Sequence, residues 1–170
     1  MTTVEVVRTY LELPDRNQLR GEESPEPGVG YERRDRCDVA EYRALYAAVG
    51  GRWAWRDRLA WTDERLRDYL DQPTVAVWEC QVCGETAGYF ELQRDDDGAV
   101  EIVYFGLIEK FLGRRLGAAM LTRAVREAWA MGATRVWLHT CTLDSPRALP
   151  NYLARGFEQI RQVSYTEEFP

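Results

Sequence analysis

The stretch EIVYFGLIEKFLGRRLGAA, residues 101–119, decides the fold of this chain. Its first eight residues are rich in β-branched and aromatic side chains, a composition typical of a strand buried on both faces. Apolar residues then recur with the three- and four-residue spacing of an amphipathic helix, at Leu116, Met120, Ala124, Val125 and Ala128. The stretch therefore predicts a buried strand, a turn with two glycines and a long helix.

The turn between strand and helix is a candidate phosphate-binding site. Gly113 and Gly117 enclose Arg114, Arg115 and Leu116. The first turn of a helix has unpaired backbone N–H groups and carries the positive end of the helix dipole, so it attracts anions. Two adjacent arginines add to this attraction. The competing interpretation is that the glycines serve only close packing of the helix on the strand.

Two motifs resemble signatures of the GNAT (Gcn5-related) N-acetyltransferase superfamily. The glycine turn is similar to the acetyl-CoA-binding motif Q/R-x-x-G-x-G/A, with Leu112 at the Gln or Arg position and Arg115 at the first glycine. Residues 145–157, SPRALPNYLARGF, are similar to the signature N-x-x-A-x-x-x-Y-x-x-x-G-F, with Ser145 at the Asn position. With the strands around them, the two motifs cover residues 74–165.

The order of the predicted elements agrees with this resemblance. We expect strands at residues 2–12, 74–80, 86–93, 99–108, 134–140 and 157–165, and helices at residues 38–49, 62–70, 115–131 and 145–154. Residues 2–12 alternate and end before Pro14, which favours an edge strand; residues 14–35 are charged and rich in Pro and Gly, which favours a surface loop. The resemblance implies an α/β GNAT fold in a single N-acetyltransferase domain over residues 1–170. Its sheet would be twisted, mixed and mostly antiparallel, flanked by helices, with splayed central parallel strands.

Composition narrows the classes of partner and the compartment. The chain has 170 residues and a net charge of −6, which disfavours nucleic acid and anionic membranes as partners and weakly favours cationic substrates. No apolar run approaches a membrane span, and four cysteines without a signal peptide indicate reduced thiols in the cytoplasm. Cys80 and Cys83 have the spacing of half a zinc site, but His139 and Cys141 are their only available completion, so we expect no metal.

The resemblance implies acetyl-CoA as the co-substrate. Main-chain amides of the glycine turn would hold its pyrophosphate, and the backbone of residues 105–107 would pair with the pantetheine arm like an added strand. A positive φ at Arg115 would carry an energetic cost. The residues expected to bind acetyl-CoA are Phe105, Gly106, Leu107, Gly113, Arg114, Arg115, Leu116, Gly117, Ala118 and Ser145.

Acyl transfer to an amine calls for a base, because an alkylamine with a pKa of about 10.4 is almost fully protonated at pH 7. Glu101 is the candidate, since a glutamate begins a similar E-I-V-aromatic run in the histone acetyltransferase branch of the superfamily and acts there as base. We expect Glu101 on the same face of its strand as Val103 and Phe105. Glu91, expected opposite Ile102, is the alternative base, and two close carboxylates would raise each other's pKa. The competing interpretation of Glu101 is a glutamate that merely faces solvent.

The acid expected to protonate the departing thiolate is Tyr152, by the place that the resemblance gives it in the Y-x-x-x-G-F motif. The competing interpretation is a half-buried aromatic residue on an amphipathic helix. A backbone N–H near Leu107 would stabilise the oxyanion that forms during transfer.

The acceptor is expected to be a primary amine of a small molecule, an amino acid or a peptide. Aromatic rings attract ammonium ions, and arginines pair with carboxylates. The residues expected to contact the acceptor are Trp53, Trp55, Arg56, Glu91 and His139. Core packing of the tryptophans and a structural role of His139 are the competing interpretations. A non-catalytic acyl-CoA-binding regulatory module and a protein or peptide N-acetyltransferase stay open as other functions, and a homodimer is a candidate assembly.

Overall fold

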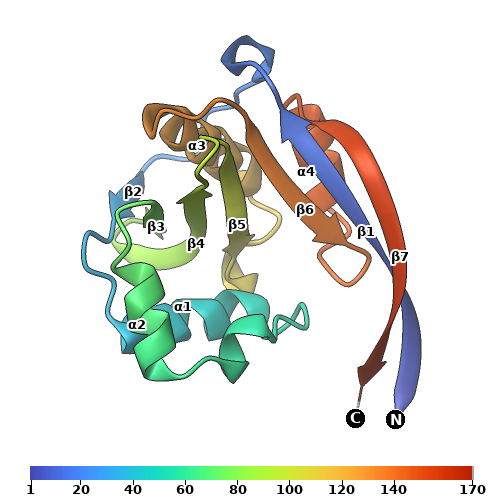
Figure 1. Ribbon diagram of the computed structural model, residues 1–170. Coiled ribbons are helices and arrows are strands. Elements are labelled where there is room, and N and C mark those ends of the chain that lie inside the picture. The colour runs from blue at the N-terminus through green and yellow to red at the C-terminus, as the bar shows by residue number, and fades with distance from the viewer. Residues whose placement is uncertain (170) are drawn as a thin grey trace.

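A seven-stranded sheet in the order β2-β3-β4-β5-β6-β1-β7 forms the centre of the molecule (Figure 1). The computed structural model describes residues 1–169. The strands are β1 (Thr2–Leu13), β2 (Val29–Arg33), β3 (Val75–Val82), β4 (Glu85–Arg94), β5 (Val100–Leu107), β6 (Val136–Cys141) and β7 (Glu158–Phe169). The helices are α1 (Val39–Gly50), α2 (Asp63–Leu70), α3 (Leu116–Ala130) and α4 (Ala148–Ala154). Strands β5 and β6 are parallel, and the other neighbouring pairs are antiparallel.

Helices cover both faces of this sheet and bury a hydrophobic cluster on each. Helix α3 packs Met120 and Val125 against one face, where α4 adds Tyr152. Helices α1 and α2 pack Tyr42 and Leu66 against the other face. The predicted α/β fold, a mixed and mostly antiparallel sheet between helices, is confirmed. None of the helices in residues 1–169 combines the length and the apolar character that crossing a membrane requires.

Strand β1 is an interior strand, so the prediction of an edge strand is wrong. It pairs with β6 through residues 8–13 and with β7 through residues 2–12. Val6, Leu11 and Leu13 are completely buried. Alternation along a sequence records which face of a strand is buried, but it does not tell whether the strand has one neighbour or two. The outer parts of β1 and β7 extend away from the rest of the sheet and carry both ends of the chain (Figure 1).

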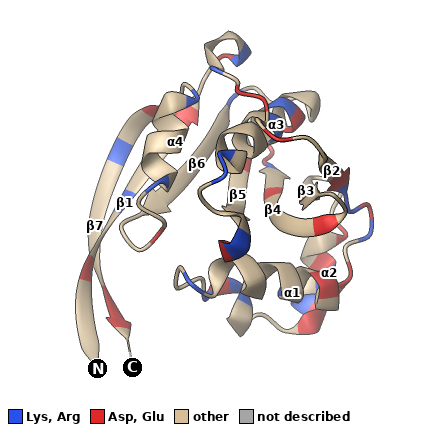
Figure 2. Ribbon diagram, turned by 180° about the vertical axis from the view of Figure 1, so that it is seen from behind, with Lys and Arg blue, Asp and Glu red and all other residues tan. Residues whose placement is uncertain are grey.

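The segment expected as a loop, residues 14–35, contains a strand and is fixed by ion pairs. Strand β2 extends the sheet beside β3. Residues 20–26, which we call the acidic segment, cross α3 on the way to β2 (Figure 2). The glutamates of the acidic segment form the ion pairs Glu22–Arg115, Glu22–Arg155, Glu23–Arg126 and Glu26–Arg114. Its charge therefore has local partners, and the segment is held along α3.

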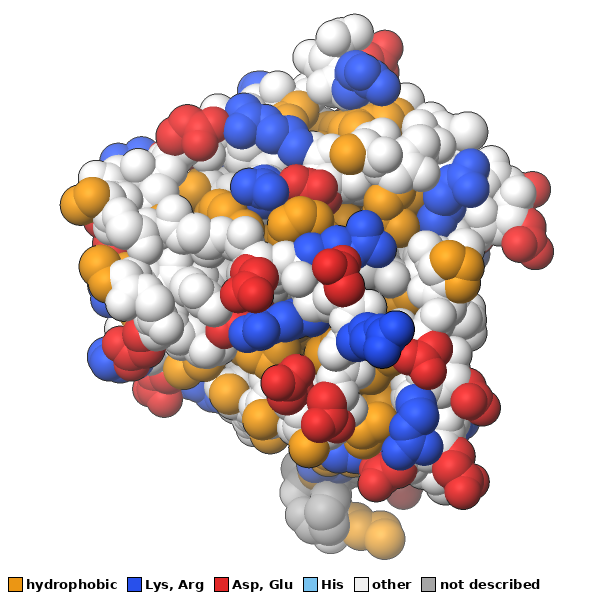
Figure 3. Space-filling view, turned by 90° about the vertical axis from the view of Figure 1, so that its left-hand side faces the viewer, with side chains coloured by type: hydrophobic (Ala, Val, Ile, Leu, Met, Phe, Trp, Pro, Cys, Tyr) orange, Lys and Arg blue, Asp and Glu red, His pale blue; other side chains and the backbone are white. Residues whose placement is uncertain are grey.

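Ion pairs also organise the side of the molecule where β2 and α2 lie. In Figure 3, Lys and Arg side chains are interleaved with Asp and Glu across this face, and hydrophobic side chains form small separate patches. Arg34 binds Glu79 of β3, and Arg43 of α1 binds Asp63 of α2 at 2.8 Å. Both signs of charge thus alternate over this surface.

A β-bulge in β5 changes the register that the sequence suggested. Glu91 pairs with Tyr104 and Leu92 pairs with Ile102, so Val103 is an extra residue in β5. The expectation that Glu91 lies opposite Ile102 is therefore wrong by one position on β4. The residues of β4 and β5 predicted two strands, but a bulge inside a strand leaves no composition signal in this sequence.

The bulge also separates residues that we expected on one face of β5. An extra residue reverses the faces that the following side chains occupy. Glu101 lies on the side of α1 and α2, where the charge of Glu91 acts on it. Phe105 lies on the opposite side and packs edge-on against Tyr152, with ring centroids 6.2 Å apart. The expectation that Glu101 and Phe105 share a face is wrong.

Glu91 joins three separate segments to the sheet from a completely buried position. The Tyr42 hydroxyl of α1 donates to its carboxylate at 2.5 Å and the Tyr69 hydroxyl of α2 at 2.6 Å. Arg58, from the loop between these helices, donates from Nη2 at 2.9 Å. A buried carboxylate with this many donors is satisfied, but loss of the carboxylate would leave the Arg58 charge unpaired.

We predict that Glu91→Ala lowers the free energy of unfolding by about 3–5 kcal/mol, because one partner of a buried pair is removed. The measurement is urea denaturation at pH 7. The matched control is Glu85→Ala, which removes the exposed ion pair with Lys110 and should cost less than about 1 kcal/mol. Equal effects of the two substitutions would show that the Glu91 cluster does not hold α1 and α2 to the sheet.

Candidate functional site

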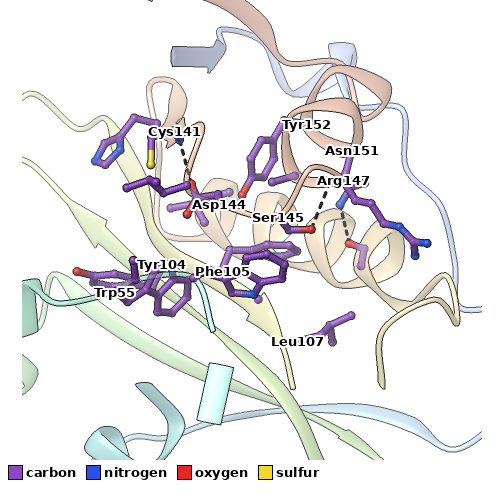
Figure 4. Close-up of a pocket in the computed structure, with 18 of the residues that line it drawn as sticks. Trp55, Tyr104, Phe105, Leu107, Cys141, Asp144, Ser145, Arg147, Asn151 and Tyr152 are labelled. Atoms are coloured by element: carbon purple, nitrogen blue, oxygen red, sulfur yellow. Dashed lines mark hydrogen bonds between the residues drawn. The ribbon is translucent and has the colours of Figure 1, made fainter. Parts of the chain in front are cut away.

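The strands β5 and β6 part after two paired positions, Val100 with Val136 and Glu101 with Trp137. From Ile102 onward, β5 forms no ladder with β6 within residues 1–169. A cavity of about 530 Å³ opens there, walled by both strands, the start of α3, α4, the loop after α1 and the β1–β7 pair (Figure 4). The free strand edge offers main-chain donors and acceptors to an extended ligand.

The turn before α3 forms one end of the cavity. Gly113 has φ of 77° and Arg115 has φ of 61°, so both are in the left-handed region. The expected cost of a side chain at position 115 is therefore present, because an L-residue other than glycine is strained there. The Arg115 side chain at the N-cap of α3 makes no capping hydrogen bond, and the N–H groups of this first turn begin at the cavity wall formed by Leu116, Gly117 and Ala118.

Helix α4 fixes this turn from the other side. The Asn151 amide donates to the Gly117 carbonyl at 3.1 Å. Ser145 lies in the turn before α4, where its Oγ accepts from the Arg147 N–H at 3.3 Å and its carbonyl accepts from the Ala148 N–H at 2.9 Å. The helix accordingly starts at Ala148, three residues later than the sequence suggested. Ser145 and Arg147 both line the cavity beside the glycine turn.

The acidic segment pairs with arginines at the same end of the cavity. Arg114 donates from Nε to Glu26 at 3.0 Å, and Arg115 pairs with Glu22. Arg115 still lines the cavity, whereas Arg114 does not. An anion that binds at this turn meets guanidinium groups that already have carboxylate partners.

Tyr152 points from α4 into the cavity opposite Phe105 (Figure 4). Its side chain is almost completely buried, and it lines the cavity. Burial raises the pKa of its hydroxyl, and the charge of Asp144 raises that pKa further. The hydroxyl is therefore protonated at neutral pH and can act as a proton donor.

Glu101 lies where β5 and β6 part, with Oε1 3.7 Å from Nε2 of His139. It is not among the cavity walls, although 19% of its side chain stays exposed, whereas His139 does line the cavity. Burial raises the pKa of Glu101 to about 7, and the charge of Glu91 contributes to this rise. Burial, together with the charge of Arg8, lowers the pKa of His139. A nitrogen placed beside this pair can hydrogen-bond to both groups at neutral pH.

Aromatic side chains form the wall beyond Glu101. Trp55 packs on Tyr46 and Tyr104, with ring centroids 5.6 and 4.8 Å away, and it lines the cavity together with Trp53 and Arg56. Trp55 therefore belongs both to the core and to the cavity wall. The Arg56 guanidinium lies 4.6 Å from the ring centroid of Phe169.

The structure brings most of the predicted site residues to one cavity. All ten predicted acetyl-CoA contacts except Arg114 line it, as do Trp53, Trp55, Arg56, His139 and Tyr152. Glu91 does not, because its carboxylate is buried in the cluster with Arg58. Gly106 also has a packing role, since a Cβ there would lie 2.5 Å from Val49 Cγ1.

Sequence reasoning missed the cavity residues that come from β1 and β7. Arg8, Tyr165 and Glu167 line the cavity on the side of His139. They lie near the two ends of the sequence, and only the placement of β1 between β6 and β7 brings them here. The alternation of residues 2–12 did predict a strand. Its interpretation as an edge strand, however, left out the second neighbouring strand and so gave no reason to place Arg8 at the site. In residues 1–169 no three His, Cys, Asp or Glu side chains are grouped as metal ligands would be.

Comparisons with known proteins agree with this geometry. The sequence profile of the Acetyltransferase (GNAT) family matches residues 41–157. A GCN5-related N-acetyltransferase from Kribbella flavida is 20% identical with a TM-score of 0.69, over 96% of this chain and 58% of that chain. One from Sphaerobacter thermophilus is 18% identical with a TM-score of 0.64, over 96% and 51%.

A third similar structure is an aminoglycoside acetyltransferase, meta-AAC0020, from an uncultured soil metagenomic sample. It is 14% identical with a TM-score of 0.63, over 76% of this chain and 88% of that one. No curated protein matches the sequence. The chain spans between half and two thirds of the length of the first structures that it matches.

We predict that Glu101→Gln stabilises the protein at pH 8 by about 3 kcal/mol and has little effect at pH 4. The folded pKa of Glu101 is raised to about 7 from 4.5, so wild-type stability falls as pH rises between these values, whereas glutamine does not titrate. The measurement is urea denaturation at both pH values. The control is Glu5→Gln, at an exposed carboxylate of the same sheet. An equal effect of Glu101→Gln at both pH values would contradict the raised pKa.

Proposed function

The chain belongs to the acetyltransferase (GNAT) family, and we propose that it transfers an acetyl group from acetyl-CoA to a primary amine of a small molecule, an amino acid or a peptide. The amine would attack the thioester directly while both substrates are bound. One observation carries the proposal: a single cavity connects the first turn of α3, the free edge of β5, Tyr152 and His139. The cytoplasmic location expected from the sequence belongs to the same proposal.

The residues at the α3 end fit acetyl-CoA. Uncapped N–H groups of the first turn of α3 suit a pyrophosphate, and the dipole of the helix favours its charge. Arg115 and Arg147 line this end and add positive charge. The free edge of β5 at residues 105–107 offers main-chain hydrogen bonds to the amide groups of the pantetheine arm. The chain can therefore hold both the charged and the extended part of this substrate.

The base in this proposal is Glu101, which works beside His139. With a pKa raised to about 7, Glu101 accepts a proton from an ammonium group more readily than an ordinary carboxylate does. His139 presents a neutral imidazole between Glu101 and the cavity, so it can orient the amine. Burial rather than a second active carboxylate is the main cause of the raised pKa, which leaves Glu91 a structural role.

The acid in this proposal is Tyr152. Its hydroxyl reaches the cavity from α4, on the opposite side of the sheet from Glu101. A raised pKa keeps the proton on the hydroxyl until a thiolate forms nearby. Base and acid on opposite faces suit a reaction in which the amine approaches from one side and the thiol departs on the other. A main-chain N–H on the free edge near Leu107 would stabilise the oxyanion.

The competing function is a regulatory module that binds acyl-CoA without turnover, motivated by Leu112, Arg115 and Ser145. Isothermal titration with acetyl-CoA tests binding, and thiol release over an amine panel tests turnover. The panel includes polyamines, amino acids, short peptides and an aminoglycoside, since an aminoglycoside acetyltransferase shares the fold. Thiol release that depends on an added amine supports the transferase. Tight binding without release on the whole panel supports the module.

We predict that Tyr152→Phe lowers kcat by about 10²-fold or more and leaves the affinity for acetyl-CoA nearly unchanged, because only the acidic proton is lost. Thiol release gives kcat and titration gives the affinity. Phe157→Leu, a change in the same cluster that keeps the Tyr152 hydroxyl, is the control. Undiminished turnover in Tyr152→Phe would remove this residue from the mechanism.

We predict that Glu26→Gln and Glu22→Gln each tighten acetyl-CoA binding by about two- to tenfold at low salt, because they release Arg114 and Arg115 for the phosphates of the substrate. Titration at two salt concentrations checks this, and the gain should shrink as salt rises. Glu23→Gln, which releases Arg126 further along α3, is the matched control. Weaker binding in Glu26→Gln would mean that the acidic segment positions Arg114 rather than competing for it.

A further inference from the structure

The cavity half remote from the glycine turn has a polar wall formed by β6, β1 and β7. In the register of the antiparallel β1–β6 ladder, Arg8 lies opposite Cys141, and Tyr10 lies opposite His139. Side chains of paired residues, and of residues two apart on a strand, point to the same face. Arg8 and His139 therefore share the face on which Glu101 lies, and both line the cavity.

Arg8 differs in its neighbours from Arg58 and Arg115, two other arginines near the cavity. Arg58 is paired with Glu91, and Arg115 is paired with Glu22. The groups around Arg8 are tyrosines instead: its Nη2 donates to the Tyr165 hydroxyl at 3.3 Å, and its guanidinium lies 5.1 Å from the centroid of that ring. Tyr10 is the second tyrosine beside Arg8, and against the opposing effect of burial its hydrogen bond raises the pKa of the Arg8 guanidinium.

The Nε–H of Arg8 is buried and has no hydrogen-bond partner within residues 1–169. A buried donor without an acceptor is costly, and for a charged group the cost is larger. The planar guanidinium of arginine presents its N–H donors as forks, and the fork formed by the two Nη groups also matches the two oxygens of a carboxylate. Because Nε is shielded from solvent, the donors that Arg8 can offer to a ligand in the cavity are its terminal Nη groups, which have no carboxylate partner within residues 1–169.

The surroundings favour a singly charged oxyanion. Asp57 and Glu167 also line the cavity, and the protein has a net charge of −6. A phosphate dianion would meet repulsion from these carboxylates, whereas a carboxylate brings half that charge. Two residues along a strand span about 7 Å, so a carboxylate on Arg8 lies several bonds away from an amine beside His139.

We propose that Arg8 binds a carboxylate of the acceptor, which makes the acceptor an amino acid or similar compound with its reactive amine several bonds from the carboxylate. This inference rests on the proposed transfer to an amine and names its substrate class. The carboxylate is held by β1, and the amine is directed to Glu101 and His139. Diamines of the same length that lack the carboxylate leave the Arg8 fork empty.

The test compares lysine with cadaverine and ornithine with putrescine, pairs that differ in the carboxylate. We expect kcat/KM from thiol release to be at least about tenfold higher for the amino acids. Arg8→Met should remove this preference, because KM for lysine rises while KM for cadaverine stays the same. Arg8→Lys should restore part of the preference. Arg161→Met is the control, because Arg161 stacks on Tyr10 of the same sheet but does not line the cavity.

Equal kcat/KM for the members of each pair in the wild-type protein, or an unchanged preference in Arg8→Met, would overturn the inference. Thermal unfolding of each variant shows whether it is folded. If no amine causes thiol release, the proposed function fails. Titration of the protein with lysine and with cadaverine then still tests whether Arg8 binds a carboxylate. Binding of lysine that exceeds cadaverine in the wild type and is lost in Arg8→Met supports it, and equal binding overturns it.

Discussion

The early separation of β5 from β6 is the constraint on which the rest of the structure depends. A buried strand edge must satisfy its N–H and C=O groups, yet β5 has β6 as partner at only two positions. The cavity keeps this edge accessible, so an extended ligand can complete the hydrogen bonds that a strand would make. The helices on both sides then determine what surrounds such a ligand. Helices α3 and α4 bring the glycine turn and Tyr152 to one face, and β6 brings His139 to the other.

Charges around the cavity are organised in three ways with different consequences. Glu91 and Arg58 are buried and fully paired, so they fix α1, α2 and the loop between them, and the charge of Glu91 also raises the pKa of Glu101. The acidic segment pairs with exposed arginines beside the glycine turn, where water and salt weaken each pair. Arg8 has no carboxylate partner within the described residues. The buried charges give rigidity, the exposed pairs can exchange, and Arg8 is left for a ligand.

Local signals in the sequence predicted most of the fold. The features that were missed depend on pairing between strands that lie far apart in the sequence. Asp38 and Thr62 stand at the predicted starts of α1 and α2, and the side chain of each accepts from a backbone N–H of its helix. The glycine turn and Tyr152 of the Y-x-x-x-G-F motif lie in the wall of one cavity. The interior position of β1 and the bulge at Val103 were missed, because both depend on which strand lies beside which. Arg8 was overlooked for the same reason, and the buried role of Glu91 depends on partners that come from three different segments.

The position of β1 between β6 and β7 has a consequence for biosynthesis. Strand β1 is translated before the other six strands of this sheet, yet the two strands beside it are the last two of the seven to be made. Until residues 136–169 have been made, β1 lacks both of its partner strands, and both of its edges are free to pair with other chains. Nascent chains therefore pass through a stage in which β1 has been made but is unpaired, and this stage lasts until β6 and β7 have been translated.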